Sequence, residues 1–414
     1  MSENPLLTES QLPYGAPQFD KIRAEHYLPA FRQAISEAKA DVDAIVNNPD
    51  APDFPNTIEA LEFAGRTLNR VSGIFYNILE ADTNDELQRI AEEVSPLMTE
   101  YEMYVSLNDR LFERVKAVYA DKDGLEPDQL RLLENTYRSF ARNGANLSAE
   151  DKAVYSKYVE ELSLLSLQFG KNVLASTNAY KLHLTDSSDL AGLPDYVREL
   201  GAMTAGERGL EGWVFTLDYP SYLPFMQNSE RPDLRREMFL AYNSKALGGE
   251  NDNTETVRKI ADLRIKIANI LGYETWADYV LEENMAKDKA TVVKFLDNLM
   301  TPSLPYARKD VEAVFDYAKA NGFAEMARAA GMDPDQFMPW DFSYWSEKYK
   351  QAEYALSDEQ LKPYFRLEDC IDAVFSLAGR LYGISFEERK DIPVYHKDVK
   401  VYDVKDADGS HLAL

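Results

Sequence analysis

Histidines are the first side chains to examine for chemistry, because imidazole is a common metal ligand and general base. The chain of 414 residues has four of them, His26, His183, His396 and His411, and they lie far apart in the sequence. None is followed by glutamate and no two are four residues apart, so the H-E-x-x-H helix that places two imidazoles on one face is missing. We interpret His26 as a structural residue at a helix start and the other three as structural residues on strands or turns.

Other reactive groups give no recognisable motif. The sequence has no G-x-S-x-G, no G-x-x-x-x-G-K and no G-x-G-x-x-G. Its single cysteine, Cys370, excludes an intrachain disulfide framework and a cysteine-rich metal site, and it lies in the predicted helix 367–381 as a small core or boundary residue. Adjacent carboxylates such as Glu92 and Glu93 point about 100 degrees apart on a helix, which favours a solvated face over a shared acid–base site.

Aromatic side chains are in excess, with 25 Tyr, 19 Phe and 4 Trp, and they concentrate in segments 213–225 and 339–349. Core packing explains most such residues. The wall of a peptide-binding cleft uses the same residues, since rings give contact area at low entropic cost. Spacing leaves both interpretations open. The candidates for lining a substrate channel are Trp213, Tyr219 and Tyr222, and no catalytic, cofactor-binding or metal residue is assigned.

Composition limits the class of protein. There are 71 acidic and 45 basic residues, a net charge of -26, which disfavours nucleic acid and anionic membrane surfaces as partners. The 45% hydrophobic content is enough for a large core. No apolar run reaches the roughly 18 residues of a membrane span, and the first residues do not resemble a secretory signal. We expect a cytoplasmic protein, although a chain that has lost a signal peptide would look the same.

The elements that must position these residues are mostly helices. From Asn56 to Leu79 apolar residues recur at steps of three and four, the period of one buried helical face. Pro55 and the pair Asn56 and Glu59 indicate a helix start of the capping-box type. The same period recurs in four further segments: 154–169, 257–271, 292–300 and 371–381.

Strand signals are few. Residues 180–185 and 213–217 predict a small β element with a long connection. A second signal at 399–404 is followed by a turn sequence at 406–409 and the beginning of a return strand at 411–414. A hairpin arm that stops after a few residues leaves its partner with an open edge, so we expect a truncated chain. A disordered tail that happens to resemble a turn is the alternative.

Several of these segments resemble a known family. Residues 212–225, 231–237 and 271–279 resemble the thimet oligopeptidase family of zinc metallopeptidases. Similarity to its bacterial peptidyl-dipeptidase branch, the dipeptidyl carboxypeptidases, is carried by four segments: Pro339-Trp-Asp341, Leu361–Phe365, Leu381–Ile384 and Asp391–Val399. The resemblance runs from near His26 to Leu414.

The resemblance implies a mainly α, two-lobed, neurolysin-like fold closing over a deep channel, with small β elements near 180–217 and 399–414. It also implies that dipeptides are removed from the C-terminus of short peptides. In that family, zinc held by H-E-x-x-H and a later Glu polarises a water, and the motif Glu is the general base. Those residues lie beyond Leu414, so none is carried onto a position here. The implied domains are an N-terminal helical region, 1–211, and the beginning of the peptidase domain, 212–414.

We therefore expect the N-terminal portion of a zinc-dependent peptidyl-dipeptidase. The 414-residue chain alone is expected to bind no zinc and to be inactive. Its expected partners are short peptides, in the parent protein, and the missing C-terminal portion. The alternative is a non-catalytic helical interaction module derived from such a peptidase and complete at 414 residues.

Overall fold

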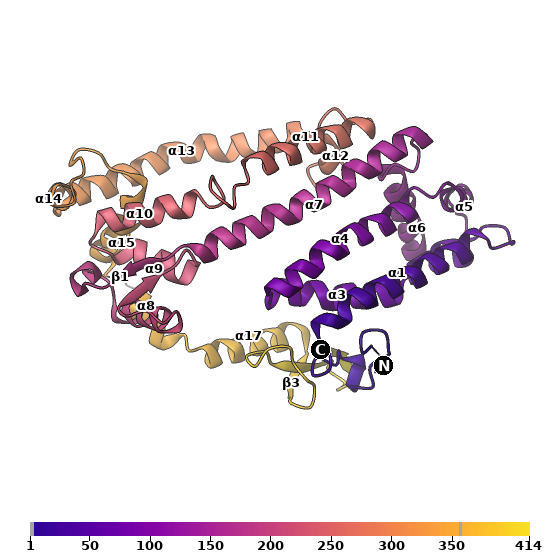
Figure 1. Cartoon of the computed structure of the whole chain (residues 1–414), viewed down its shortest axis with the longest axis horizontal. Helices are drawn as coiled ribbons and strands as arrows, with labels where there is room; N and C mark the ends of the chain where they lie inside the picture. Colours follow the sequence, from indigo (N-terminus) through magenta and orange to yellow (C-terminus); the bar gives the residue numbers. More distant parts are fainter. Residues whose placement is uncertain (1–3, 356–357) are drawn as a thin grey trace. The chain divides into compact units, whose positions relative to one another are not determined.

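The computed structural model describes residues 4–355 and 358–414 (Figure 1). The chain forms two compact units, and neither is continuous in sequence. The first unit comprises residues up to 167 together with 259–276 and 367–414, and the second comprises 168–258 and 277–366. The expected domains, 1–211 and 212–414, divide the sequence in a different way, and that division stays a prediction.

The mainly helical fold expected from the sequence is confirmed. Helices of the first unit are α1 (Ala24–Val46), α2 (Ala60–Phe63), α3 (Arg66–Ala81), α4 (Asp85–Ser106), α5 (Asp109–Ala120), α6 (Pro127–Arg142) and α17 (Leu367–Tyr382). Helices of the second are α8 (Asp195–Glu207), α9 (Tyr219–Asn228), α10 (Pro232–Asn243), α13 (Lys289–Ala320), α14 (Phe323–Ala329), α15 (Pro339–Tyr354) and α16 (Asp358–Leu361). Three helices include residues of both units: α7 (Ala149–Ala179), α11 (Thr254–Ile270) and α12 (Trp276–Leu281).

The core of the first unit forms where α1 packs against α3 and α4 (Figure 1). Ala30, Ala34 and Ala38 form a fully buried stripe on α1, and these small side chains let the neighbouring helices approach closely. Phe31 and Phe75 fill the space between α1 and α3, with ring centroids 5.4 Å apart and ring planes nearly perpendicular.

Segment 56–79 is mostly helical, as predicted, but it is not one helix and its predicted cap is wrong. The N-cap is Asp53, whose carboxylate accepts a hydrogen bond of 2.7 Å from the Asn56 amide. The Asn56 side chain in turn accepts from the Asp53 amide at 3.1 Å, so the box begins one turn earlier than predicted and does not use Glu59. A π-helical turn, Phe54–Glu59, and α2 follow, and Gly65 with φ +69° then separates α2 from α3.

Both predicted β elements are present. Strands β1 (Leu182–Leu184) and β2 (Trp213–Phe215) are antiparallel in the second unit, with His183 opposite Val214. In the first unit β4 (Val401–Lys405) and β5 (His411–Ala413) form the predicted hairpin. A further strand, β3 (Ser385–Arg389), pairs with the other edge of β4. The prediction missed β3 because only one of its five residues, Phe386, is apolar.

Tyr14 fixes an N-terminal turn to this sheet. We call the contacts of Tyr14 with His411 and Asp403 the Tyr14 latch. Tyr14 adopts φ +58°, an uncommon conformation for a residue with a side chain, and stacks on His411 with ring centroids 3.5 Å apart. Its hydroxyl donates to the buried carboxylate of Asp403 at 2.9 Å, and Nδ1 of His411 lies 2.7 Å from the other oxygen of Asp403. The guanidinium of Arg389 lies 3.6 Å from the same carboxylate.

Two predicted helices keep apolar faces in water. Segment 292–300 is helical within α13, yet Val293, Phe295 and Leu296 are each more than half exposed. Segment 371–381 is helical within α17, and Val374 and Leu377 are exposed to a similar degree. The period therefore predicts these helices correctly, and the structure shows that these apolar faces are exposed. Within the described residues no helix combines the length and apolar character needed to cross a membrane.

Candidate functional site

The three candidate channel residues lie on consecutive elements of the second unit. Trp213 begins β2 and packs partly buried against the core that β1, α8 and α9 share. Tyr219 is the first residue of α9, and its side chain is 64% exposed. Tyr222 follows one helical turn later and is half-buried on the same core. The structure therefore offers Tyr219 to solvent and uses Trp213 and Tyr222 in packing.

Tyr222 also stacks on Tyr242 of α10, with ring centroids 4.2 Å apart and planes within 18 degrees. The ammonium of Lys245 lies 3.8 Å from the centre of the Tyr242 ring, a cation–π contact. Burial, with a smaller contribution from Tyr242, raises the pKa of Tyr222. The phenol of Tyr222 is therefore neutral at ordinary pH and can act only as a hydrogen-bonding and stacking group.

A buried ion pair joins two of the segments that carry the family resemblance. Arg235 comes from segment 231–237, and Asp341 ends Pro339-Trp-Asp341. The arginine is fully buried and the aspartate is 3% exposed, and an Nη of Arg235 lies 2.7 Å from the carboxylate of Asp341. This contact holds the start of α10 against the start of α15.

Every edge of the Arg235 guanidinium has a partner. One Nη donates to the Ser229 carbonyl at 2.7 Å, and Nε donates to the Trp340 carbonyl at 3.3 Å. The plane lies 4.5 Å from the centre of the Tyr344 ring. Burial lowers the pKa of Arg235 and raises the pKa of Asp341, in each case against the opposing effect of the partner. Because arginine begins from so high a value, the guanidinium stays charged.

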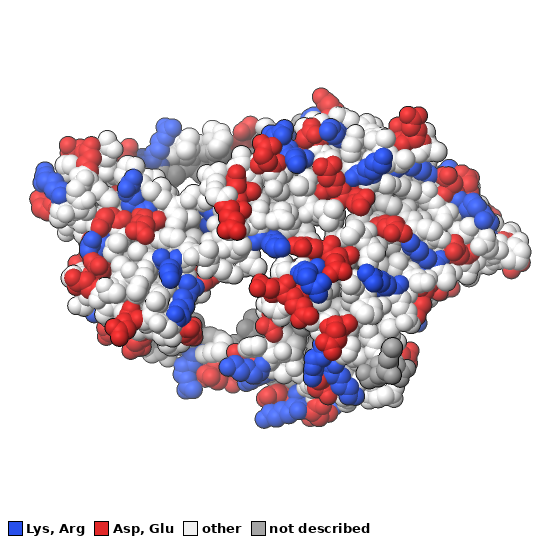
Figure 2. Space-filling view, viewed as in Figure 1, with Lys and Arg blue, Asp and Glu red and all other residues white. Residues whose placement is uncertain are grey.

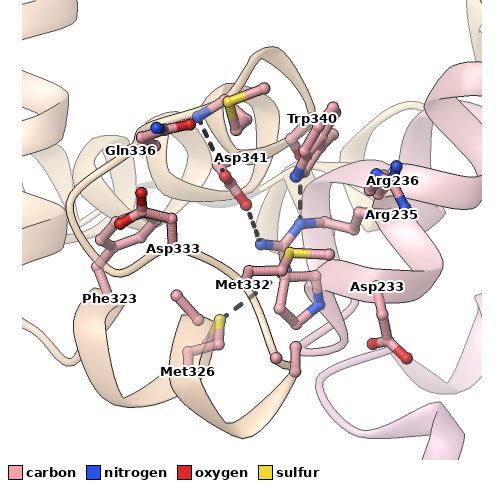
Figure 3. Close-up of a pocket in the computed structure, with 15 residues that line it drawn as sticks. Asp233, Arg235, Arg236, Phe323, Met326, Met332, Asp333, Gln336, Trp340 and Asp341 are labelled. Atoms are coloured by element: carbon pink, nitrogen blue, oxygen red, sulfur yellow. Dashed lines mark hydrogen bonds and ion pairs between the residues drawn. The ribbon is translucent and has the colours of Figure 1, made fainter.

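A cavity of about 370 Å³ lies beside this ion pair, between α10, α14 and the loop that leads into α15 (Figure 3). Figure 3 shows Asp341 pointing toward Arg235, with Met326 and Met332 close to the guanidinium. The sulfur of Met326 lies 4.0 Å from an Nη of Arg235. The cavity walls thus combine thioether and aromatic groups with a paired charge.

The histidines have structural contacts and do not gather. Nδ1 of His26 accepts from the Arg23 amide at the start of α1, at 3.0 Å. Nε2 of His183 lies 2.7 Å from the Glu211 carbonyl, across the β1–β2 pair. Nδ1 of His396 accepts from the Asp398 amide at 3.3 Å. In residues 4–355 and 358–414, no group of three or more His, Cys, Asp or Glu side chains is placed to hold a metal ion.

Comparison with known proteins defines the class to which this helical chain is similar. The family described as Peptidase family M3 matches residues 225–413. The chain is 35% identical over 422 residues to a dipeptidyl carboxypeptidase of Salmonella typhimurium, covering 100% of this chain and 60% of that protein. It is also 32% identical over 413 residues to oligopeptidase A of Escherichia coli, covering 97% of this chain and 58% of that protein.

These matches confirm the resemblance found in the sequence. The chain is peptidase-like, and its similarity is to the peptidase M3 family and its dipeptidyl carboxypeptidases. It spans about 60% of the length of the curated relatives it matches.

Sequence reasoning missed Arg235, Asp341 and the cavity beside them. The two residues are 106 positions apart, and no spacing rule pairs residues at that distance. A signal was present, because Arg235 is followed by the apolar run Met238-Phe-Leu240 and Asp341 follows Pro-Trp, both within the segments that carry the resemblance. Charged residues inside such segments are candidates for a buried pair.

Proposed function

We propose that this chain is the N-terminal portion of a zinc-dependent peptidyl-dipeptidase, which removes dipeptides from the C-terminus of oligopeptides. The observation that carries the proposal is the 35% identity with a dipeptidyl carboxypeptidase along the whole chain. The Arg235–Asp341 pair is consistent with it, because this contact joins two of the segments that carry the resemblance.

The zinc site of the proposed parent does not fit the residues described here. No metal-binding cluster occurs among them, and the histidines bond to backbone groups or to Asp403. We therefore derive no catalytic step from this chain. The zinc is proposed for the parent protein, and the 414-residue chain alone is proposed to be inactive.

Tyr219 is the residue of this chain proposed to contact substrate in the parent, and Trp213 and Tyr222 are proposed to support it. Tyr219 is exposed at the first turn of α9. Figure 2 shows acidic and basic side chains interspersed on the visible face without an extended basic area, which suits peptide partners better than nucleic acid. A cytoplasmic location stays a proposal as well.

The second candidate function is a non-catalytic interaction module. The exposed apolar faces of α13 and α17 favour it, since unpartnered apolar surface is typical of sites where another protein packs. The same faces suit a chain whose remaining portion covers them. The activity of the complete gene product distinguishes the two candidate functions.

The test is to read the encoding gene past Leu414 for H-E-x-x-H and to express the longest product next to the 414-residue chain. We expect the long product to hold one zinc ion by elemental analysis and to release dipeptides from the C-terminus of a model oligopeptide, detected by mass spectrometry. The 414-residue chain is expected to do neither. One tightly held zinc in the short chain, or an open reading frame that stops at Leu414, would overturn the proposal.

A further inference from the structure

We propose that the cavity between α10, α14 and α15 is a binding site for a short zwitterionic peptide, of dipeptide size, with apolar side chains. The ligand class is inferred from the walls and rim of the cavity alone. It coincides with the product class of the proposed function but does not rest on that function, because binding can be measured on a chain that hydrolyses nothing.

The size and the walls of the cavity suit apolar side chains. Its volume is about 370 Å³, whereas a buried apolar cavity of about 150 Å³ already holds one benzene ring. Phe323 and Trp340 supply aromatic wall, and Met326, Met332 and Met338 supply thioethers. Methionine side chains are flexible and polarisable, so this wall can adapt to leucine-like and phenylalanine-like side chains alike.

The floor of the cavity carries no unpaired charge, so it does not require a charged group on the ligand. Arg235 and Asp341 neutralise each other at 2.7 Å, and each of the three guanidinium nitrogens of Arg235 has an acceptor. One buried polar atom is left over: Trp340 is 9% exposed, and its indole nitrogen has no hydrogen-bond acceptor among the described residues. That nitrogen has essentially no accessible surface, so the floor of the cavity is neutral and presents no free donor to a ligand.

The rim offers one charge of each sign. Asp233 is engaged by Arg231 through two hydrogen bonds of 3.0 and 2.6 Å, so its charge is already compensated. Asp333 and Arg236 are exposed and make no ion pair in the described part of the chain, and Figure 3 shows them on opposite sides of the cavity. An ammonium group at Asp333 and a carboxylate at Arg236 are the two ends of a zwitterion.

The experiment is calorimetric titration of the 414-residue chain with the dipeptide Leu-Phe. We expect saturable binding that weakens roughly two- to fivefold when the amine is acetylated or the carboxyl is amidated, since each rim charge is solvent-exposed. Asp333→Asn and Arg236→Gln should each weaken the binding of Leu-Phe to the same degree. Acetylation of the amine should then not weaken binding to Asp333→Asn any further, and amidation of the carboxyl should not weaken binding to Arg236→Gln any further. Gly-Gly, which has no side chains for the apolar wall, should bind more weakly than Leu-Phe.

Matched controls come from the same region. Asp335→Asn and Arg328→Gln change exposed charges that do not line the cavity, and they should leave binding unchanged. Ala330→Leu places a larger side chain on the half-buried wall and should abolish binding while the helical circular dichroism is retained. Absence of saturable binding at millimolar Leu-Phe, or binding that neither rim variant nor Ala330→Leu alters, would overturn the proposal.

Discussion

Arg235 illustrates how one residue can hold a substructure together. Its guanidinium reaches Ser229, Trp340 and Asp341, so the turn before α10 and the first turn of α15 share one buried charge. Burying a charge is unfavourable unless it is paired and fully hydrogen-bonded. The arrangement therefore gives specificity of packing, and the energetic penalty falls on any variant that leaves one member of the pair alone.

We expect Arg235→Met, which leaves the Asp341 carboxylate without its cation, to lower the free energy of unfolding by about 3–5 kcal/mol, measured by urea denaturation. The double variant Arg235→Met with Asp341→Leu should recover much of that loss, because no lone charge remains buried. Arg231→Gln, which removes a partly exposed cation four residues earlier, is the control and should cost about 1 kcal/mol or less. Equal losses in Arg235→Met and in the control would contradict the account.

Tyr219 and Tyr222 are expected to respond differently to truncation in the full-length parent. Tyr219→Ala removes an exposed ring and should raise the KM for oligopeptides while leaving the thermal midpoint within a few degrees. Tyr222→Ala removes the stack on Tyr242 and should lower the midpoint as well. Unchanged peptide kinetics in Tyr219→Ala would show that the exposed ring does not contact substrate.

At the residue scale, sequence reasoning considers one side chain at a time. The four histidines, with no partner at a ligand spacing, find backbone or carboxylate contacts instead. It fails to predict a contact between two residues that are far apart in the sequence, such as Arg235 and Asp341. It also could not rank the channel candidates, since exposure of Tyr219 and packing of Tyr222 depend on which face of α9 meets α10.

Elements are positioned in this chain by a few backbone constraints. Gly212, which precedes β2, has φ +89°, and a Cβ there would overlap the Leu184 carbonyl oxygen at the end of β1. Gly209, three residues earlier, has φ +66° but open space around the position. A comparison of the two glycines therefore separates the effect of a left-handed backbone from the effect of close approach to β1.

Gly212→Ala is expected to destabilise the protein by about 3 kcal/mol or more, because it combines an unfavourable φ with a clash against β1. Gly209→Ala should cost roughly 1–2 kcal/mol from φ alone. Urea denaturation of the two variants measures the difference. Equal costs at the two positions would show that the approach of residue 212 to β1 is not tight in solution.

The Tyr14 latch should weaken in acid. The hydrogen bond from His411, with a further one from Tyr14, lowers the pKa of Asp403, so the folded pKa lies below the unfolded one. Such a carboxylate stabilises the fold fully above its unfolded pKa, about 3.9, and the contribution disappears as the pH falls through the lowered folded value. We expect amide exchange at Gly15 and Ala16, corrected for intrinsic rates, to accelerate below about pH 4 relative to α1.

Tyr14→Phe is the matched variant for the latch, since it keeps the ring on His411 and removes only the hydroxyl. It should exchange severalfold faster at Gly15 even at pH 7. Protection at Gly15 that is the same in the wild type and the variant at both pH values would show that the hydroxyl does not hold the turn.

Elements with a regular period were predictable, and interruptions were not. The helices at 154–169, 257–271, 292–300 and 371–381 follow from the 3.6-residue period. The break at Gly65 was hidden because the apolar face continues in register through it, from Ile58 to Leu68. Strand β3 carries charged residues on a short edge, so hydrophobicity alone does not reveal it.

Over the whole molecule, the property that the sequence pattern does not predict is exposed apolar surface. Besides the faces of α13 and α17, an apolar cavity of about 430 Å³ lies between α17, the β3–β4–β5 sheet and the segment that follows the Tyr14 latch. Periodicity detects an apolar face but cannot say what covers it. Burial was therefore the least predictable property of this fold.

We expect the 414-residue chain to form dimers or small oligomers that depend on concentration, seen by sedimentation. Salt should strengthen association, because it screens the repulsion of a -26 charge. Val374→Glu with Leu377→Glu, on the exposed face of α17, should reduce it. Adding a separately made C-terminal portion of the proposed parent should compete with self-association. A strictly monomeric chain that does not bind that portion would favour the self-contained interaction module.

The Tyr14 latch also has a consequence for biosynthesis. Asp403 follows Tyr14 by 389 residues, so at roughly 5–20 residues per second a ribosome completes the partner about 20–80 s after Tyr14 has been made. Until then the N-terminal turn has neither its carboxylate nor its stacking ring. The turn around Tyr14 is thus not fixed until Asp403 and His411 have been made, and during that interval it is open to chaperones and to proteases.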